Sequence, residues 1–179
     1  FSQDHLDYFG TMERYFDTKK SFMTGGQVRN AALNADDETI GRIREELSVP
    51  YLTYGISAEA DLYARDIEIS ENGVEFKAIL HGTNEFDVHL NMTGMFNVYN
   101  ALAAASCAMV LGIETQNICK GLAAIQSVPG RIETLQTRTP YKIILDYSHS
   151  PDALTNILRT VREFARGRII ALFGCGGDR

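Results

Sequence analysis

The chain has 179 residues, of which 45% are hydrophobic and 22% are charged, so it can bury a core and is not a wholly disordered chain. Seventeen basic and twenty-three acidic residues give a net charge of −6, and no block of like positive charge occurs, which argues against duplex nucleic acid as a partner. No run of about 18 apolar residues is present, so the sequence offers no candidate membrane span. Three cysteines without metal-like spacing indicate free thiols in a reducing cytosol.

The first half of the chain is expected to contain helices and β-strands. Apolar residues at helical spacing predict a helix over residues 11–24. The acids within residues 34–37 are expected to start a helix that ends near Leu47. The dipeptide Asn72-Gly73 predicts a hairpin turn. The segments with strand-forming patterns are a short run to Leu33 and residues 51–55, 62–69, 73–81 and 85–91.

The second half of the sequence completes the first domain with two helices and then predicts a new α/β unit. Helices are expected over residues 96–111 and 115–125, and the Pro129-Gly130 turn marks a boundary between domains at residues 1–128 and 129–179. The strand–helix–strand order that follows favours a parallel sheet. Its expected elements are strands 131–137 and 142–146, a helix from Pro151 to about Ala165, and a strand over 168–173.

Two residues near the start could take part in a metal site. His5 lies between Asp4 and Asp7, and a histidine nitrogen with a carboxylate oxygen can share a divalent metal, although an Asp–His hydrogen bond in a loop explains the pattern equally. Lys19 shares an apolar helical stripe with Tyr15. Its amine either reaches out to solvent or is buried, and burial would favour the neutral form that reacts with carbon dioxide to give a metal-binding carbamate.

Two asparagines follow a glycine turn at the start of the alanine-rich helix. Asn97 and Asn100 are three residues apart, so both amides are expected on one helical face. An amide donates and accepts hydrogen bonds at once and so matches the edge of an adenine ring. The alternative is that Asn97 caps the helix and Asn100 is solvated.

The residues after the boundary suggest contacts to an anion. Arg131 follows a glycine turn and can bind two phosphate oxygens, or can form a surface salt bridge. Asp146 ends an apolar strand, where ligands bind in α/β sheets, and suits a ribose or a metal-bound water. Arg179 follows a glycine-rich turn at a second strand end and could clamp a carboxylate.

Six stretches together resemble the Mur ligase family, in the order in which that family has them. They are DHLDYFGTMERYFDTKK, NADD, GMFNVYNALAA, PGRIE, DYSHSPDAL and FGCGGDR. The last two resemble the branch of the family that adds a diamino acid. The resemblance implies an α/β fold: the back half of the central ATP-binding domain, followed by the first strands and helix of the Rossmann-like C-terminal domain.

The resemblance also implies an activity. Members join the carboxyl end of UDP-MurNAc-L-Ala-D-Glu to meso-diaminopimelate or L-lysine through an acyl phosphate, using ATP and Mg²⁺, in cytoplasmic peptidoglycan synthesis. The parent protein is expected to be a monomer without nucleic-acid or membrane partners. By their positions in the motifs, the residues implied are His5 and a carbamylated Lys19 as catalytic magnesium ligands, Asn97 and Asn100 near adenine, Arg131 and Asp146 near the ATP phosphates and ribose, and Arg179 on the carboxylate of the diamino acid.

The sequence lacks several parts of the family pattern, and the missing phosphate-binding loop bears most directly on activity. It contains no G-x-x-x-x-G-K-[ST] phosphate-binding loop, so the chain is expected to be part of a longer protein and to be inactive by itself. A folylpolyglutamate synthase-like glutamate ligase and a non-enzymatic α/β nucleotide-binding module remain as alternatives.

Overall fold

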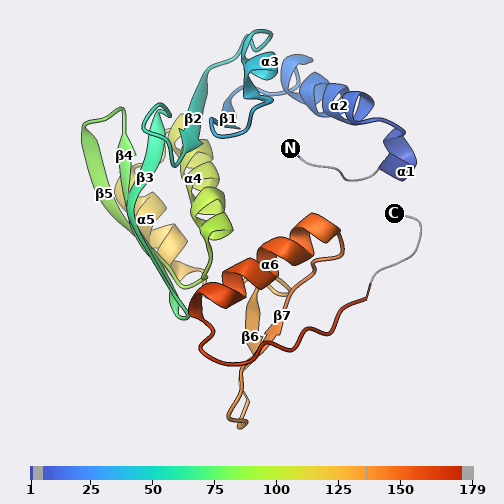
Figure 1. The fold of residues 1–179 in the computed structure, drawn as a ribbon. Helices are drawn as coiled ribbons and strands as arrows, with labels where there is room; N and C mark the ends of the chain where they lie inside the picture. The colour runs from blue at the N-terminus through green and yellow to red at the C-terminus, as the bar shows by residue number, and fades with distance from the viewer. Residues whose placement is uncertain (2–5, 136, 175–179) are drawn as a thin grey trace.

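The computed structural model describes residue 1, residues 6–135 and residues 137–174, and it has a mixed α/β architecture (Figure 1). Among the described residues no helix is both long and apolar enough to cross a membrane. The elements in chain order are α1 (Leu6–Phe9), α2 (Met12–Thr24), β1 (Ala31–Asn34), α3 (Ile40–Arg44), β2 (Tyr51–Gly55), β3 (Leu62–Ser70), β4 (Gly73–Leu80), β5 (Asn84–Leu90), α4 (Met95–Val110), α5 (Thr115–Ala124), β6 (Glu133–Leu135), β7 (Ile143–Leu145) and α6 (Pro151–Phe164).

The first five strands form one sheet in the order β1-β2-β3-β4-β5. β1, β2 and β3 are parallel neighbours, whereas β3, β4 and β5 are antiparallel. The expected hairpin is confirmed, since Ser70 pairs with Gly73 across the β3–β4 turn. Because β1 and β2 are parallel, the loops that follow them lie at the same edge of the sheet, where α/β proteins bind ligands.

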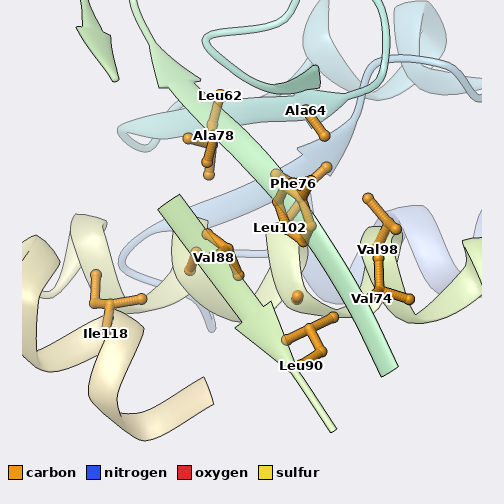
Figure 2. Close-up of a cluster of buried hydrophobic side chains, with 12 residues drawn as sticks. Leu62, Ala64, Val74, Phe76, Ala78, Val88, Leu90, Val98, Leu102 and Ile118 are labelled. Atoms are coloured by element: carbon orange, nitrogen blue, oxygen red, sulfur yellow. The ribbon is translucent and has the colours of Figure 1, made fainter. Parts of the chain in front are cut away.

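One face of this sheet packs on α4 and α5 to form the main core (Figure 2). The β4 strand turns Val74, Phe76 and Ala78 into the core, while Glu75 between the first two is exposed. Small side chains on α4 let this helix approach the sheet closely. The buried cluster comprises Leu62, Ala64, Val74, Phe76, Ala78, Val88, Leu90, Val98, Ala101, Leu102, Ala105 and Ile118.

The helix expected to begin within residues 34–37 begins later, at Ile40, and is short. The polar side chains of this loop bond to the loop backbone instead: Asn34 Oδ1 accepts a hydrogen bond from Asp36 N at 3.0 Å, and Asp37 Oδ1 accepts one from Thr39 N at 2.9 Å. These are turns of the kind that Asn and Asp favour, and they compete with helix formation.

The C-terminal part contains a two-stranded antiparallel sheet, β6–β7, followed by α6. The expected start of α6 is confirmed: Ser150 is the N-cap, its Oγ accepts a hydrogen bond from Ala153 N at 3.3 Å, and Pro151 occupies the first turn. Placing the domain boundary between residues 128 and 129 stays a prediction; these residues lie between α5 and β6.

The strand expected over residues 168–173 is wrong for this structure. These residues form no ladder with any described strand, so the predicted parallel pair is absent from the described part of the chain. Leu172 is fully exposed. A strand exists only where its backbone groups pair with a neighbour, and an apolar sequence pattern does not supply that neighbour.

The two parts of the chain touch at the start of α4 and at the β3–β4 turn. A Cβ built on Gly94, at the start of α4, would lie 2.7 Å from Thr160 Cγ2 of α6, and Thr160 is buried there. Lys142 Nζ lies 2.6 Å from Glu71 Oε2 at the β3–β4 turn, and its hydrogen bond lowers the pKa of Glu71. The C-terminal part therefore lies against the β3–β4 turn and the start of α4 (Figure 1).

Candidate functional site

Lys19 lies on α2 with its side chain in solvent. Thr11 caps this helix, with its Oγ1 accepting a hydrogen bond from Arg14 N at 3.2 Å. The Lys19 side chain is exposed, and its Nζ lies 5.0 Å from the centre of the Tyr15 ring, a cation–π distance. The structure therefore shows the solvent-reaching alternative, and a buried neutral amine is wrong for this chain as described.

Lys20 on this helix has two acidic side chains near its amine. Its Nζ lies 2.9 Å from Glu46 Oε1 and 3.9 Å from Asp17 Oδ1, and the hydrogen bond to Glu46 raises the pKa of Lys20. Glu13, also on α2, pairs with Arg42 of α3. Lys20 thus joins α2 to the end of α3, while Lys19 remains available to a ligand.

A cavity of about 440 Å³ lies beside Lys19, between α2, β1, α3 and β2. Its polar members are Lys19, Asn34, Asp37 and Thr39, and the rest of its wall is largely apolar. Asn34 and Asp37 belong to the loop that follows β1, so this cavity opens at the carboxyl edge of the parallel strands.

Asn97 and Asn100 share one face of α4, as predicted. Asn97 is buried, and its Nδ2 donates to Thr93 O at 2.9 Å, whereas Asn100 is exposed and its Nδ2 donates to Asn97 Oδ1 at 3.2 Å. The N-cap of α4 is Gly94, so Asn97 does not cap the helix. The amide pair is held by hydrogen bonds, with Asn100 at its exposed end.

Asp36 and Tyr99 form a contact that sequence reasoning did not single out. The Tyr99 hydroxyl, on α4, donates to Asp36 Oδ2 at 3.0 Å. Burial and this hydrogen bond raise the pKa of Tyr99 to about 12. Both residues belong to motifs with a family resemblance, NADD and GMFNVYN, but only the folded chain places the two motifs together.

Asp146 accepts hydrogen bonds through both of its carboxylate oxygens. Its Oδ2 accepts a hydrogen bond from Ile132 N at 3.0 Å, and its Oδ1 accepts from Ser148 N at 2.9 Å and from the Ser148 hydroxyl. These bonds tie the end of β7 to the turn that carries Arg131. In this structure Asp146 fixes that turn.

Arg131 is exposed beside an aromatic ring. Its guanidinium carbon lies 5.8 Å from the centre of the Tyr147 ring, and Tyr147 N donates to Gly130 O at 2.8 Å. Arg131 also lines a polar cavity of about 650 Å³ between the β3–β4 turn, the segment before α4 and the β6–β7 hairpin. The guanidinium is therefore open to an anionic ligand.

The structure brings some of the predicted site residues together and keeps others apart. Asn97 and Asn100 are in contact, and Asp146 binds the turn of Arg131. Lys19 lies at the 440 Å³ cavity, which shares no lining residue with the 650 Å³ cavity of Arg131. His5 and Arg179, for which the sequence predicts site roles, lie outside the described residues, as does Cys175.

The described residues alone do not fit a magnesium site. Among them, no group of three or more His, Cys, Asp and Glu side chains is arranged to hold a metal ion. Lys19 has an aromatic ring near its amine and is exposed. We therefore derive no step through a metal from these residues.

The architecture and these motif positions define a member of the Mur ligase family. Residues 1–108 match the Mur ligase middle domain, and residues 130–179 match the glutamate ligase domain of Mur ligases. The chain belongs to this family.

Two of the similar proteins carry the same name, which states their substrates. The chain is 44% identical to the UDP-N-acetylmuramoyl-L-alanyl-D-glutamate–2,6-diaminopimelate ligase of Halalkalibacterium halodurans over 181 residues, covering 98% of the chain and 37% of the relative. It is 39% identical to the Clostridium botulinum protein of the same name, covering 99% of the chain and 37% of the relative. The chain thus spans just over a third of the length of these relatives.

Solved structures agree in fold. A ligase with the same 2,6-diaminopimelate name superimposes with a TM-score of 0.77 at 30% identity, covering 99% of the chain and 37% of the solved chain. MurF from Acinetobacter baumannii gives a TM-score of 0.81 at 24% identity, covering 92% of the chain and 36% of that structure. The second likeness shows the shared fold alone.

Proposed function

We propose that the full-length gene product containing this chain is an ATP-dependent amide ligase that adds 2,6-diaminopimelate to UDP-MurNAc-L-Ala-D-Glu in peptidoglycan synthesis. The observation that carries the proposal is the 44% identity, over 98% of the chain, to a relative named for these substrates. The sequence left L-lysine and meso-diaminopimelate open, and the relatives' names favour diaminopimelate.

The proposed reaction has two steps. The terminal carboxylate of the UDP-linked dipeptide attacks the γ-phosphorus of ATP, which forms an acyl phosphate and releases ADP. The amine of the diamino acid then attacks the acyl carbon, and phosphate leaves as the amide forms and the amine loses a proton. Positive groups near the transferred phosphoryl stabilise the charge that develops on its oxygens.

The described residues have separate roles in this proposal. Asn100, at the exposed end of the amide pair, and Asn97 behind it contact the adenine edge. Arg131 pairs with ATP phosphate oxygens, a role that its exposed guanidinium supports. Asp146 contacts the ribose in this proposal. Its hydrogen bond from Ile132 N supports a further role, which is to hold the turn of Arg131 in place.

The remaining predicted residues stay predictions. His5 and a carbamylated Lys19 as magnesium ligands in the full-length protein, and Arg179 on the diamino-acid carboxylate, rest on their positions in the family motifs. The exposed amine of Lys19 beside the 440 Å³ cavity is compatible with later modification. A cytoplasmic monomer is also proposed on family grounds alone.

A glutamate ligase of the folylpolyglutamate synthase type is the competing enzyme. The solved L. casei FPGS mutant shares the fold, with a TM-score of 0.70 at 18% identity, and this likeness carries no substrate information. No feature of the described residues favours that activity, or a non-enzymatic nucleotide-binding module, over the Mur ligase proposal.

A coupled assay of ADP release by the full-length gene product tests the proposal. We expect turnover that requires ATP, UDP-MurNAc-L-Ala-D-Glu and diaminopimelate together, and a lower rate with L-lysine. Release of ADP only with a folate and glutamate would overturn the proposal in favour of the competing ligase. ATP binding without turnover on either substrate set would favour the non-enzymatic module.

A further inference from the structure

The carboxylate of Asp36 lies where three segments of the chain meet. Asp36 is in the loop after β1, and its Oδ2 accepts a hydrogen bond from the backbone N of Ile56, just after β2, at 2.7 Å. The same oxygen accepts the hydroxyl of Tyr99, on α4, at 3.0 Å. A single acceptor therefore joins the carboxyl ends of two parallel strands to the helix that carries the asparagine pair.

The backbone around Asp36 is shaped for this contact. Gly55 is buried at the end of β2, and a Cβ built on it would lie 2.5 Å from Asp36 Oδ2, so a larger residue would displace the carboxylate. On its other side, Asp36 N donates to Asn34 Oδ1 at 3.0 Å. The loop that carries Asp36 therefore holds the carboxylate in place, and Gly55 leaves the space that the carboxylate occupies.

Tyr99 occupies the turn of α4 that carries the candidate adenine contacts. It lies between Asn97 and Asn100 in sequence, and successive residues of a helix are related by a rotation of about 100°. A Tyr99 hydroxyl held by Asp36 therefore adds to the restraint that the buried Val98 and Leu102 place on the rotation of this turn about the helix axis. The ring of Tyr99 is half-buried, which limits the positions that its hydroxyl can take.

We propose that Asp36 is a positioning residue for nucleotide binding: through Tyr99 it sets the rotation of the first turns of α4, and with it the direction in which Asn97 and Asn100 face the adenine base. The inference rests on the proposed function, because it requires that the asparagine pair contacts ATP. Asp36 itself touches no reacting atom.

Steady-state kinetics of the full-length gene product test this inference. For Asp36→Ala we expect KM for ATP to rise about tenfold while kcat stays within about twofold, because binding is lost and the chemistry is not. Tyr99→Phe should change KM in the same direction. Asp36→Ala combined with Tyr99→Phe should be no worse than the stronger single variant, because both remove one interaction. Asp36→Asn keeps an acceptor oxygen and should restore KM to within about twofold of the unchanged protein.

A matched control comes from the same loop. Glu38 is an exposed acid two residues further on, and Glu38→Gln should leave KM for ATP unchanged. ADP binding by calorimetry should rank the variants in the same order without requiring turnover. If Asp36→Ala does not fold, Tyr99→Phe and Asp36→Asn decide, since the first removes only a hydroxyl and the second retains the acceptor.

Asn97→Ala and Asn100→Ala, measured alongside, separate this inference from the proposed function. Unchanged KM for ATP and unchanged ADP binding in both asparagine variants would remove the adenine role and the positioning role together. Weakened binding in the asparagine variants but not in Asp36→Ala or Tyr99→Phe would overturn the positioning role alone. A fully additive double variant would also overturn it, because Asp36 would then act by a route other than Tyr99.

Discussion

The two parts of the chain carry similar apolar patterns but bury them very differently. In the sheet of β1–β5 and its helices, Leu62, Leu90 and Leu102 are at most 1% exposed. In the C-terminal part, Leu145 at the end of β7 is 45% exposed and Leu172 is 100% exposed. An apolar strand pattern therefore becomes a core only where a second layer packs on it, as α4 and α5 do on β3–β5.

Truncating Leu102 should have the largest effect on stability. A small effect would contradict the contrast between the packed sheet and the exposed C-terminal part. Leu102→Ala removes a side chain in the α4–sheet core, and we expect the free energy of unfolding to fall by about 2–5 kcal/mol because a cavity is left. The same change at exposed Leu172 should cost less than about 0.5 kcal/mol. Urea unfolding followed by circular dichroism measures both. Equal losses at the two positions would show that residues 168–174 pack in solution.

Substituting Gly94 tests the contact between the two parts. Gly94 has φ +100°, and a Cβ there would lie 2.7 Å from Thr160 Cγ2 and 2.8 Å from Phe96 Cε1, so Gly94→Ala should destabilise by about 2–4 kcal/mol through strain and crowding together. Gly112, at the other end of α4, has φ +78° and nothing within 4 Å of a built Cβ. Gly112→Ala should therefore show the strain alone, about 1 kcal/mol.

Thermal and urea unfolding of the two glycine variants give the comparison directly. Adding Thr160→Ser to Gly94→Ala removes Thr160 Cγ2 and should recover part of the loss. If Thr160→Ser recovers none of the loss in Gly94→Ala, Thr160 of α6 does not rest on Gly94 in solution.

Removing the Ser106 hydroxyl should stabilise the main core slightly. Ser106 is fully buried in α4, and its Oγ has no hydrogen-bond partner among the described residues. Ser106→Ala should raise the free energy of unfolding by about 1 kcal/mol, because no desolvated hydroxyl remains. Ser148→Ala, which removes a hydroxyl bonded to Asp146 in the C-terminal part, should lower it. A loss of stability in Ser106→Ala would reveal a partner for that hydroxyl.

The smallest expected effect is a change in pH dependence at Asp61. Burial alone would raise the pKa of Asp61, but hydrogen bonds from the Thr53 N–H and hydroxyl, at 2.8 and 2.7 Å, outweigh it and lower the pKa. The stabilisation is therefore present above the unfolded value of about 4 and is lost as pH falls through the lower folded pKa. Asp61→Asn should flatten the stability profile below about pH 5.

Urea midpoints at a series of pH values measure this effect, with exposed Glu59→Gln as the control. The control should retain the slope of the unchanged chain. An identical slope in Asp61→Asn would mean that the Thr53 bonds do not favour the charged form of Asp61.

Much of the local structure was predictable because it depends on short sequence patterns. The α2 helix, the β3–β4 hairpin and the start of α6 follow from helical spacing, an Asn-Gly turn and a Ser-Pro cap. The shared face of Asn97 and Asn100 follows from their spacing of three. Each of these features is fixed within a few residues.

Of the two failed expectations, one has a local cause and the other depends on a distant partner. The helix expected from residues 34–37 was replaced by turns around Asn34 and Asp37. Residues 168–173 formed no strand because no described strand pairs with them.

The sequence by itself determined the family, through motifs spread from one end of the chain to the other, and the period of each strand and helix, because those depend on residue order alone. Only the tertiary structure decided that Asp36 meets Tyr99 across 63 positions and that Lys19 and Arg131 line separate cavities. Contacts between distant segments depend on how strands pair and how helices pack on them, and a pattern within one segment carries no information about the partner of another.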